Sequence, residues 1–137
     1  MRIKVEDICT MLEVFDMPTS VAFYRDVLDF VVVKTSQPGD DFEWGLLRHG
    51  DTQLMLNTLH ERHTRPPAPD PARVAAHGDT WLFLGCRDLD AAYAHLRAHG
   101  IDAQPPVVRP YGMKQLSLKD PDGYTLCFQW TTAGAPS

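Results

Sequence analysis

Three cysteines are the most reactive side chains in this chain of 137 residues. Cys9, Cys86 and Cys127 share no C-x-x-C spacing, and each lies in an apolar run that is typical of a strand. The sequence around Cys9 and Cys127 offers no His or Arg that would stabilise a thiolate, so nucleophilic catalysis finds no support. We expect three buried free thiols.

Histidines and carboxylates give further candidate sites, and each has a simpler interpretation. His60 and His63 are three residues apart, a spacing that could place two metal ligands on one helix face, and His77 follows. Four prolines between residues 66 and 71 instead predict an extended, solvated segment without a metal site. Carboxylates that could act as a general base are Glu13, Asp40, Asp41 and Glu43. Because nothing brings a carboxylate pair together, we expect solvated surface charges and assign no catalytic residue.

Composition excludes several classes of protein. The chain is 44% hydrophobic and 23% charged, which suits one compact globular domain. Its net charge is -5 and its 13 Lys and Arg residues are scattered, so a nucleic-acid partner is disfavoured. The apolar runs are too short to cross a bilayer, and Lys4, Glu6 and Asp7 interrupt the apolar region that a signal peptide needs. We expect a cytoplasmic protein with no membrane partner.

Apolar periodicity predicts the same order of elements twice, strand, helix and three strands. Module one spans residues 1–57. Its expected elements are a strand at 8–14, a helix that starts at Pro18 with Thr19 or Ser20 and runs to Leu28, and strands at 30–35, 42–48 and 53–57. In module two, residues 80–130, they are strand 80–86, a helix capped by Asp88 and ended by Gly100, and strands 103–108, 115–119 and 124–130. Residues 58–79 are predicted as a Pro-rich linker without helix or strand, and residues 131–137 as a C-terminal tail.

The two modules match at a constant offset of 72 residues, the distance from Asp16 to Asp88. The same offset aligns Arg25 with Arg97 near the start of the modules, and it also aligns the residues near their ends. Two copies of one supersecondary unit explain such a register. We therefore predict an α+β fold of two tandem βαβββ modules, whose curved sheet surrounds a cavity opposite the helices.

This pattern resembles the vicinal oxygen chelate superfamily, which includes glyoxalases, extradiol dioxygenases and bleomycin-resistance proteins. The residues that carry the resemblance are Leu12 to Asp16, Ala22 to Phe30, Asp88 to Ala92 with Leu96 and Gly100, and Lys119 to Tyr124. Asp29 stands where the family usually has Gly. Because Asp tolerates a left-handed backbone better than most residues, we expect that turn to persist.

The resemblance implies four positions at which metal-dependent members hold their cation. Each module typically supplies His or Gln from its first strand and Glu from its last, and the matching residues here are Cys9, Met55, Trp81 and Cys127. A cation that activates substrate oxygens prefers imidazole and carboxylate ligands. The resemblance therefore implies that the usual metal is lost and that no cofactor is held. A soft site for Cu(I) or Zn on Cys9, Met55 and Cys127 is the alternative.

Alternation along the strands predicts which side chains line the cavity. The expected ligand-binding residues are Cys9, Met11, Met55, Asn57, Trp81, Phe83, Cys127 and Gln129, with Tyr111 and Met113 in a loop that could close as a lid. Sulfur, aromatic and amide groups together suit a flat, partly aromatic ligand with a few polar groups. Trp44 and Trp130 are assigned to the rim, or equally to the core or a dimer contact.

Three functions are compatible with this pattern. The first is a metal-free, homodimeric binding protein of the bleomycin-resistance type that holds a small aromatic or drug-like molecule, and the net charge of -5 slightly favours a cationic one. The second is a lyase, isomerase or dioxygenase that uses a rearranged metal site or an acid-base mechanism. The third is a structural or interaction dimer in which large side chains fill a vestigial pocket.

Overall fold

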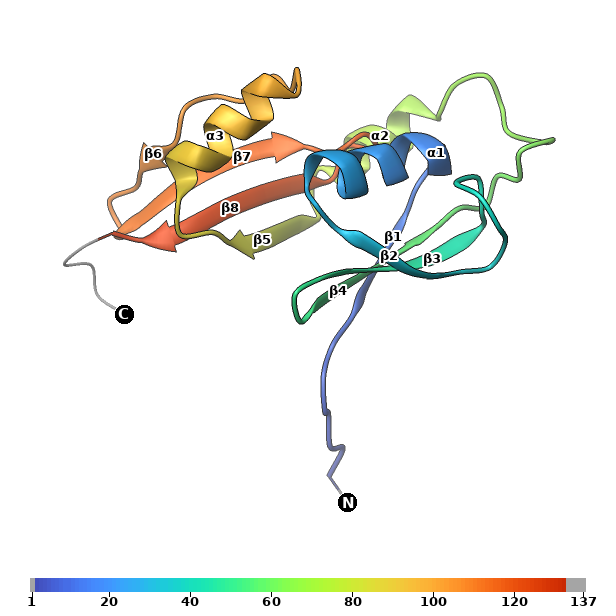
Figure 1. Ribbon diagram of the computed structural model, residues 1–137, viewed down its shortest axis with the longest axis horizontal. Coiled ribbons are helices and arrows are strands. Elements are labelled where there is room, and N and C mark those ends of the chain that lie inside the picture. The colour runs from blue at the N-terminus through green and yellow to red at the C-terminus, as the bar shows by residue number, and fades with distance from the viewer. Residues whose placement is uncertain (1, 133–137) are drawn as a thin grey trace. The chain divides into compact units, whose positions relative to one another are not determined.

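The computed structural model describes residues 2–132 and divides the chain into two compact units, with the boundary between Pro69 and Asp70 (Figure 1). Each unit contains a four-stranded mixed sheet, and the predicted α+β class with tandem βαβββ modules is confirmed. The assignment of both units to one domain stays a prediction. In the described part of the chain, no helix combines the length and apolar composition that a bilayer crossing requires.

Unit one follows the predicted order of elements. Its elements are β1 (Thr10–Glu13), α1 (Met17–Val21), the π-helical turn η1 (Ala22–Val27), β2 (Val31–Thr35), β3 (Trp44–His49) and β4 (Thr52–Asn57). The sheet order is β1-β4-β3-β2, and β1 runs parallel to β4 while the other pairs are antiparallel. A two-residue turn at Gly50 and Asp51 joins β3 to β4.

Unit two repeats this topology after one additional helix. Its elements are α2 (Pro71–His77), β5 (Trp81–Gly85), α3 (Leu89–Ala98), β6 (Val107–Val108), β7 (Met113–Lys119) and β8 (Thr125–Thr131). The sheet order is β5-β8-β7-β6, again with the first and last strands of the module in parallel. Residues 133–137 of the expected tail lie outside the described residues, and β8 includes Thr131.

Strand register and helix caps both confirm the repeat. Met11 pairs with Met55 in unit one, and Phe83 pairs with Cys127 in unit two, so both partners are shifted by 72 residues. The two helix starts are equivalent as well. The Asp16 carboxylate accepts a hydrogen bond from the Thr19 amide, and the Asp88 carboxylate accepts one from the Ala91 amide.

The structure corrects the sequence prediction at several boundaries. The first helix begins at Met17 rather than beyond Pro18, because Asp16 is its cap, and it continues as a π-helical turn. Residues 71–77 form a helix inside the segment predicted as unstructured, with Asp70 as cap and Pro71 in its first turn. The strand expected over residues 103–108 shrinks to Val107 and Val108. Asp29 has a φ of 65°, so the left-handed turn does persist with a non-glycine residue.

Each sheet buries the face that carries its helix. In sheet one that face consists of alternate residues such as Leu12, Leu47 and Leu56, all at most 2% exposed, and Met17 and Val21 of α1 are fully buried as well. In sheet two, Leu116, Leu118 and Leu126 are buried on the side of α3, whose own buried residues are Leu89 and Leu96. Burying each such side chain contributes about 1.5–3 kcal/mol. The alternate residues are left on the opposite, helix-free face of each sheet.

Candidate functional site

The helix-free face of sheet one has a floor of sulfur-bearing and aliphatic side chains. Met11 pairs with Met55, and Met55 pairs with Leu46, so these residues form one row across three strands. Met11 is 48% exposed, while Met55 and Leu46 are half-buried. Cys9 precedes β1 by one residue and is half-exposed, so the expectation of a buried thiol is wrong there. Such a floor offers flexible, polarizable contacts.

A second row on this face contains a carboxylate that the sequence interpretation left on the surface. Glu13 pairs with Asn57, and Asn57 pairs with Trp44. The Asn57 amide nitrogen donates a hydrogen bond to Glu13 Oε1 at 2.7 Å, and both residues are half-buried. The expectation of a solvated Glu13 is therefore wrong. Its spacing of two residues from Met11 was the signal that could have placed it on this face.

Two exposed aromatic rings dominate the helix-free face of sheet two. Trp81 and Phe83 stack with their centroids 5.9 Å apart and their planes 24° apart. They are 52% and 57% exposed, an unusual state for such large apolar groups. Cys127, the strand partner of Phe83, is fully buried. Cys86 lies just beyond β5 and is half-exposed, so of the three thiols only Cys127 meets the expectation of burial.

Amide side chains continue this face beyond the rings. Gln129 pairs with Gln115, whose Nε2 donates a hydrogen bond to Gln129 Oε1 at 2.8 Å. The Tyr111 hydroxyl donates to Gln115 Oε1 at 2.9 Å. Tyr111 therefore belongs to a hydrogen-bonded row, and Met113 opens β7 rather than lying in a loop. Sequence reasoning missed Gln115, because its register against Gln129 depends on the length of the turn between β7 and β8.

Trp130 and Trp44 differ in their surroundings. The Arg87 guanidinium lies 4.5 Å from the centre of the Trp130 ring, a cation–π contact. Alternation along β8 puts Trp130 on the face opposite Gln129. Trp44 instead shares the helix-free face of sheet one with Asn57. Of the two tryptophans, only Trp44 is placed by alternation on a predicted ligand face.

The four family ligand positions do not suit a hard divalent cation. Indole nitrogen is only a donor, thioether sulfur is a weak ligand for such ions, and Cys127 is buried within β8. Trp81 is engaged in the stack with Phe83. Over residues 2–132, no three His, Cys, Asp or Glu side chains gather as a metal site would require. The donor set therefore disagrees with the metal that other members hold.

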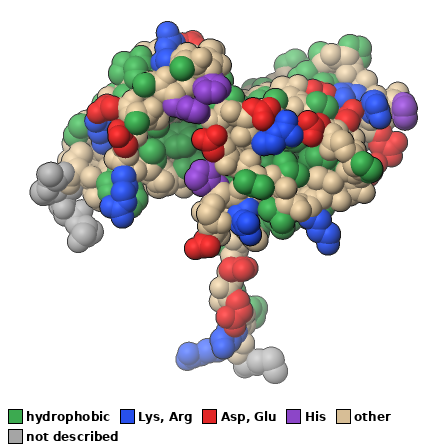
Figure 2. All heavy atoms as spheres, in the orientation of Figure 1, with side chains coloured by type: hydrophobic (Ala, Val, Ile, Leu, Met, Phe, Trp, Pro, Cys, Tyr) green, Lys and Arg blue, Asp and Glu red, His purple; other side chains and the backbone are tan. Residues whose placement is uncertain are grey.

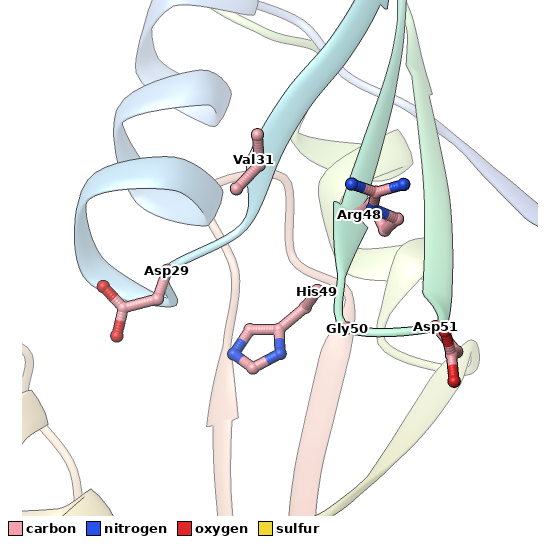
Figure 3. A pocket seen from close by; sticks show the side chains of 6 residues that line it. All are labelled: Asp29, Val31, Arg48, His49, Gly50 and Asp51. Atoms are coloured by element: carbon pink, nitrogen blue, oxygen red, sulfur yellow. The ribbon is translucent and has the colours of Figure 1, made fainter.

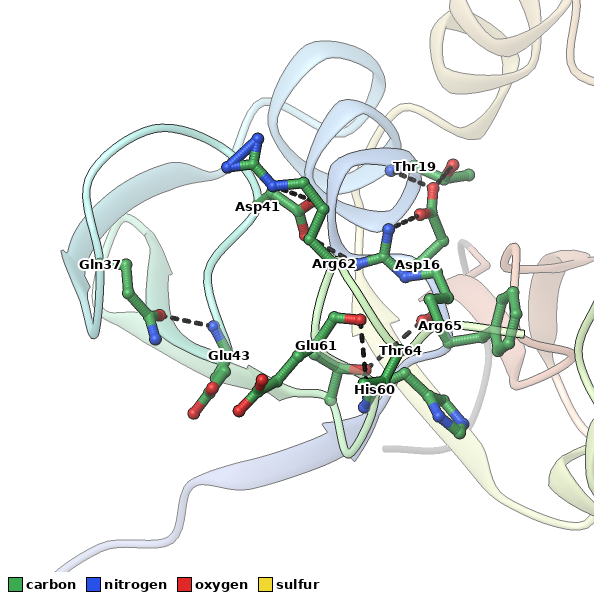
Figure 4. A network of polar contacts seen from close by, with 12 residues as sticks. Asp16, Thr19, Gln37, Asp41, Glu43, His60, Glu61, Arg62, Thr64 and Arg65 are labelled. Atoms are coloured by element: carbon green, nitrogen blue, oxygen red, sulfur yellow. Dashed lines mark hydrogen bonds and ion pairs between the residues drawn. The ribbon is translucent and has the colours of Figure 1, made fainter. Parts of the chain in front are cut away.

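Three side chains fix the first half of the predicted linker within unit one (Figure 4). Arg65 binds two carboxylates, with Nη1 at 2.8 Å from Asp16 and Nη2 at 2.7 Å from Asp41, and its side chain is only 14% exposed. His60 contacts the Phe15 ring edge-on at 5.3 Å. A polar pocket of about 450 Å³ lies beside them; residues that line it include Gln37, Glu43, Thr58, Glu61 and His63. The prediction of a solvated segment is therefore wrong for Thr58, His60 and Arg65, whereas Leu59 and residues 61–64 are exposed.

A second pocket, of about 490 Å³, lies at the β3–β4 turn (Figure 3). It is lined by Asp29, Val31, Arg48, His49, Gly50 and Asp51. The His49 ring contacts Phe30 edge-on at 5.5 Å. A guanidinium and two carboxylates offset one another there, and none of the predicted ligand residues takes part. On each unit, the view in Figure 2 shows basic side chains interspersed with acidic ones, rather than a basic stripe that would suit a nucleic acid.

Comparison with known proteins identifies the family of this chain. The model of the Glyoxalase/Bleomycin resistance protein/Dioxygenase superfamily matches residues 9–128. The chain belongs to this superfamily. One relative with a similar sequence is the uncharacterized protein YaeR of Escherichia coli strain K12. It is 33% identical over 113 residues, which are 81% of this chain and 84% of the relative.

Several solved structures share the fold. TnmS3, an antibiotic binding protein from Streptomyces sp. CB03234, matches with a TM-score of 0.69 and 22% identity, over 96% of this chain and all of that one. The bleomycin resistance determinant encoded on transposon Tn5 matches with a TM-score of 0.67 and 23% identity, over 93% of this chain and 98% of the other. A superfamily member from Nocardioides matches with a TM-score of 0.72 and 20% identity, over 99% and 91%. At these identities the likeness shows the fold.

Proposed function

We propose that this protein is a metal-free binding protein that holds a flat, aromatic or drug-like organic molecule on the helix-free face of sheet two. The observation that carries this proposal is the exposed Trp81–Phe83 stack. A flat ligand that covers these rings removes apolar surface from water, which contributes about 25 cal/mol per Å². Aromatic stacking geometry adds about 0.5–1.5 kcal/mol for each ring pair.

The neighbouring polar groups favour a ligand with hydrogen-bonding edges over a plain hydrocarbon. Gln115, Gln129 and Tyr111 form one hydrogen-bonded row next to the rings. A few placed polar groups beside an apolar wall are typical of small-molecule sites. The two solved relatives described as antibiotic binding and as a bleomycin resistance determinant have this fold, which supports a drug-like ligand.

We extend the proposal to a homodimer. Strand β2 is the edge of sheet one, and its Val31 and Val33 are 59% and 49% exposed. An edge strand with exposed apolar side chains is a surface that proteins usually cover. Light scattering on the purified protein measures the mass directly. A monomer of 15.4 kDa at every concentration would contradict this part of the proposal without affecting ligand binding.

Titration with acridine, a flat neutral heteroaromatic molecule, tests the binding function. We expect quenching of tryptophan fluorescence with saturation, and about a tenfold loss of affinity in Trp81→Ala, because one stacking partner and its buried area are removed. Tyr93→Ala is the matched control, since it also removes one partly exposed aromatic ring, but from helix α3. The proposal fails if acridine does not bind, or if both variants lose the same affinity.

A further inference from the structure

We propose that the ligand is a flat aromatic molecule with a carbonyl oxygen on its ring system, and that the side-chain amide of Gln129 donates a hydrogen bond to this oxygen. This inference rests on the proposed function and narrows its ligand class. It concerns only the helix-free face of sheet two, on which Gln129 lies beside the exposed stack of Trp81 and Phe83.

A chain of hydrogen bonds gives the amide row of this face a direction. The Tyr111 hydroxyl donates to Gln115 Oε1 at 2.9 Å, and Gln115 Nε2 donates to Gln129 Oε1 at 2.8 Å. Both amide oxygens therefore already accept hydrogen bonds from the protein. Because a primary amide nitrogen carries two N–H groups, one remains on Gln115 and two remain on Gln129. The row ends in donors rather than acceptors.

The amide nitrogen of Gln129 is available to a ligand. Within residues 2–132, Gln129 Nε2 donates to no acceptor of the protein. Gln129 is half-buried, and this nitrogen is not one of the fully buried side-chain atoms that lack a partner, so it reaches solvent. A ligand that covers the amide displaces the water that solvates it. Such a ligand binds well only if it supplies an acceptor in return.

The available donor lies one step along the face from the aromatic stack. Phe83 pairs with Cys127, and Gln129 is two residues further along β8, which corresponds to about 7 Å of strand. A fused ring system that stacks on Trp81 and Phe83 can therefore present an oxygen at its edge to Gln129. A carbonyl oxygen accepts hydrogen bonds near the plane of its ring, so this edge contact is compatible with stacking of the ring face.

The charges of sheet two favour an electron-rich ligand edge over a cationic one. The sequences of strands β5, β6, β7 and β8 contain no Asp or Glu. Lys114 Nζ is paired with Asp90 of α3 at 2.9 Å, on the helix-covered side. Lys119 instead shares the helix-free face with Trp81, and its Nζ donates to the Thr125 hydroxyl at 2.6 Å. This face is therefore basic, although the net charge of the chain is -5.

Charged residues that flank the strands do not reverse this sign near Gln129. Asp79 precedes β5 and Asp120 follows β7, which places both at the end of the face away from the amide row. Asp88 lies closer to the row, but its carboxylate caps α3. Arg87 and Arg109 are exposed and follow β5 and β6 at the end where the amide row lies. The surroundings of the amide thus repel a cation rather than attract one.

Two probes of the same ring shape and charge test the proposal. They are anthraquinone sulfonate and anthracene sulfonate, with the sulfonate at the same ring position, and they differ only in the ring carbonyls. We expect isothermal titration calorimetry to show that the wild-type protein binds the quinone about fivefold more tightly. In Gln129→Glu, which keeps an acceptor for Gln115 but removes the available N–H groups, this preference should fall by about fivefold.

Two further variants separate the lost donor from the added charge. Gln129→Met removes the amide without adding a charge, and it should lower the quinone preference by the same factor. Gln104→Glu is the matched control, because it adds the same charge at an exposed position outside the four strands, and it should keep the preference. Circular dichroism confirms that each variant is folded.

The outcomes distinguish this proposal from the proposed function. If acridine binds and its affinity depends on Trp81, but both Gln129 variants keep the quinone preference, the donor subsite is wrong and the binding function stands. The same conclusion follows if acridine binds and the wild-type protein does not prefer the quinone, or binds neither sulfonate. Equal weakening of both probes in the Gln129 variants would give this residue a structural role only and would also contradict the subsite. If acridine does not bind either, both proposals are wrong.

Discussion

The His77 ring lies flat against the ring of Tyr124, with the centroids 4.1 Å apart and the planes 7° apart. Its Nδ1 lies 2.8 Å from the carbonyl oxygen of Asp122, and its Nε2 lies 3.4 Å from the Tyr124 hydroxyl. A neutral imidazole with the proton on Nδ1 donates to the carbonyl and accepts from the hydroxyl. One side chain thereby joins α2 to the turn between β7 and β8.

Replacement of His77 by Ala should lower the free energy of unfolding by about 1–3 kcal/mol, because a ring contact and a hydrogen bond to the backbone are lost together. His99→Ala is the matched control, since His99 is exposed near the end of α3 and bonds only within its own helix. Urea denaturation at neutral pH measures both variants. Equal stability of the two variants would show that α2 is not fixed by this contact.

Helix α2 also shows where sequence reasoning stopped. The fold could be predicted because the repeat fixes strand register at both ends of each module, as Met11 with Met55 and Phe83 with Cys127 confirm. The helix was missed because four clustered prolines argue for extended chain, although Asp70 followed by Pro71 is a normal helix start. Local composition and local capping conflicted there, and tertiary packing favoured the cap.

Site residues could be predicted from the sequence only where the alternation of side chains along a strand determines them. Glu13 was assigned to the surface by its charge, although its spacing from Met11 places it on the same face. Gln115 depends on a longer-range feature. Arg48 pairs with Gln53 across one turn, whereas Lys119 pairs with Thr125 across the equivalent turn, which is one residue longer. That extra residue shifts β7 relative to β3, and single-sequence patterns do not set turn length.

Two glycines with a left-handed backbone allow the stability cost of backbone strain to be distinguished from the cost of a steric clash. Gly123 has a φ of 90°, and a Cβ added there would lie 2.3 Å from the carbonyl oxygen of Val74 in α2. Gly100 has a φ of 75°, and a Cβ there would meet open space. Gly100→Ala should therefore cost about 1–2 kcal/mol from left-handed strain alone.

Gly123→Ala should cost clearly more than Gly100→Ala, because α2 has to move as well. Thermal unfolding of both variants under one set of conditions gives the comparison. If the two melting temperatures fall equally, the close approach of α2 to the turn is absent in solution. A larger fall in melting temperature in Gly100→Ala than in Gly123→Ala would contradict the surroundings that the structure gives to both glycines.

Asp26 should titrate below its ordinary range. Its hydrogen bonds with the Arg25 guanidinium, at 2.8 and 3.2 Å, lower the pKa of this carboxyl. Because the folded pKa is lower than the unfolded one, the pair stabilises the fold above the unfolded value of about 3.9. That contribution is lost as the pH falls through the folded pKa. Carbon-detected NMR titration should find the Asp26 midpoint restored upward in Arg25→Ala, and an unchanged midpoint would show that the pair is not formed.

The three thiols should react with iodoacetamide at different rates. Burial raises the pKa of the Cys86 thiol, so this residue should react more slowly than an unhindered peptide thiol at mildly alkaline pH. Cys127 is fully buried and should stay unmodified until the protein unfolds. Cys9, which is half-exposed, should react in the folded state.

Mass spectrometry of peptides taken at successive times measures each site, and denatured protein gives the reference rates. Modification of Cys127 as fast as Cys9 in the folded protein would contradict its burial beneath the helix-free face of sheet two.

Removal of metal should leave ligand binding unchanged, and the reason is the chemistry of four side chains. The residues at the family's metal-ligand positions are Cys9, Met55, Trp81 and Cys127, and an indole has no lone pair to offer a divalent cation. We therefore expect elemental analysis of protein purified without chelator to find far less than one equivalent of any transition metal. Acridine affinity should be the same before and after dialysis against EDTA. A stoichiometric metal whose removal abolishes acridine binding would contradict this expectation. If a Cys9→Ser and Cys127→Ser double variant then lost that metal, the site would be a soft thiolate site, because thiolates select ions such as Cu(I) and Zn.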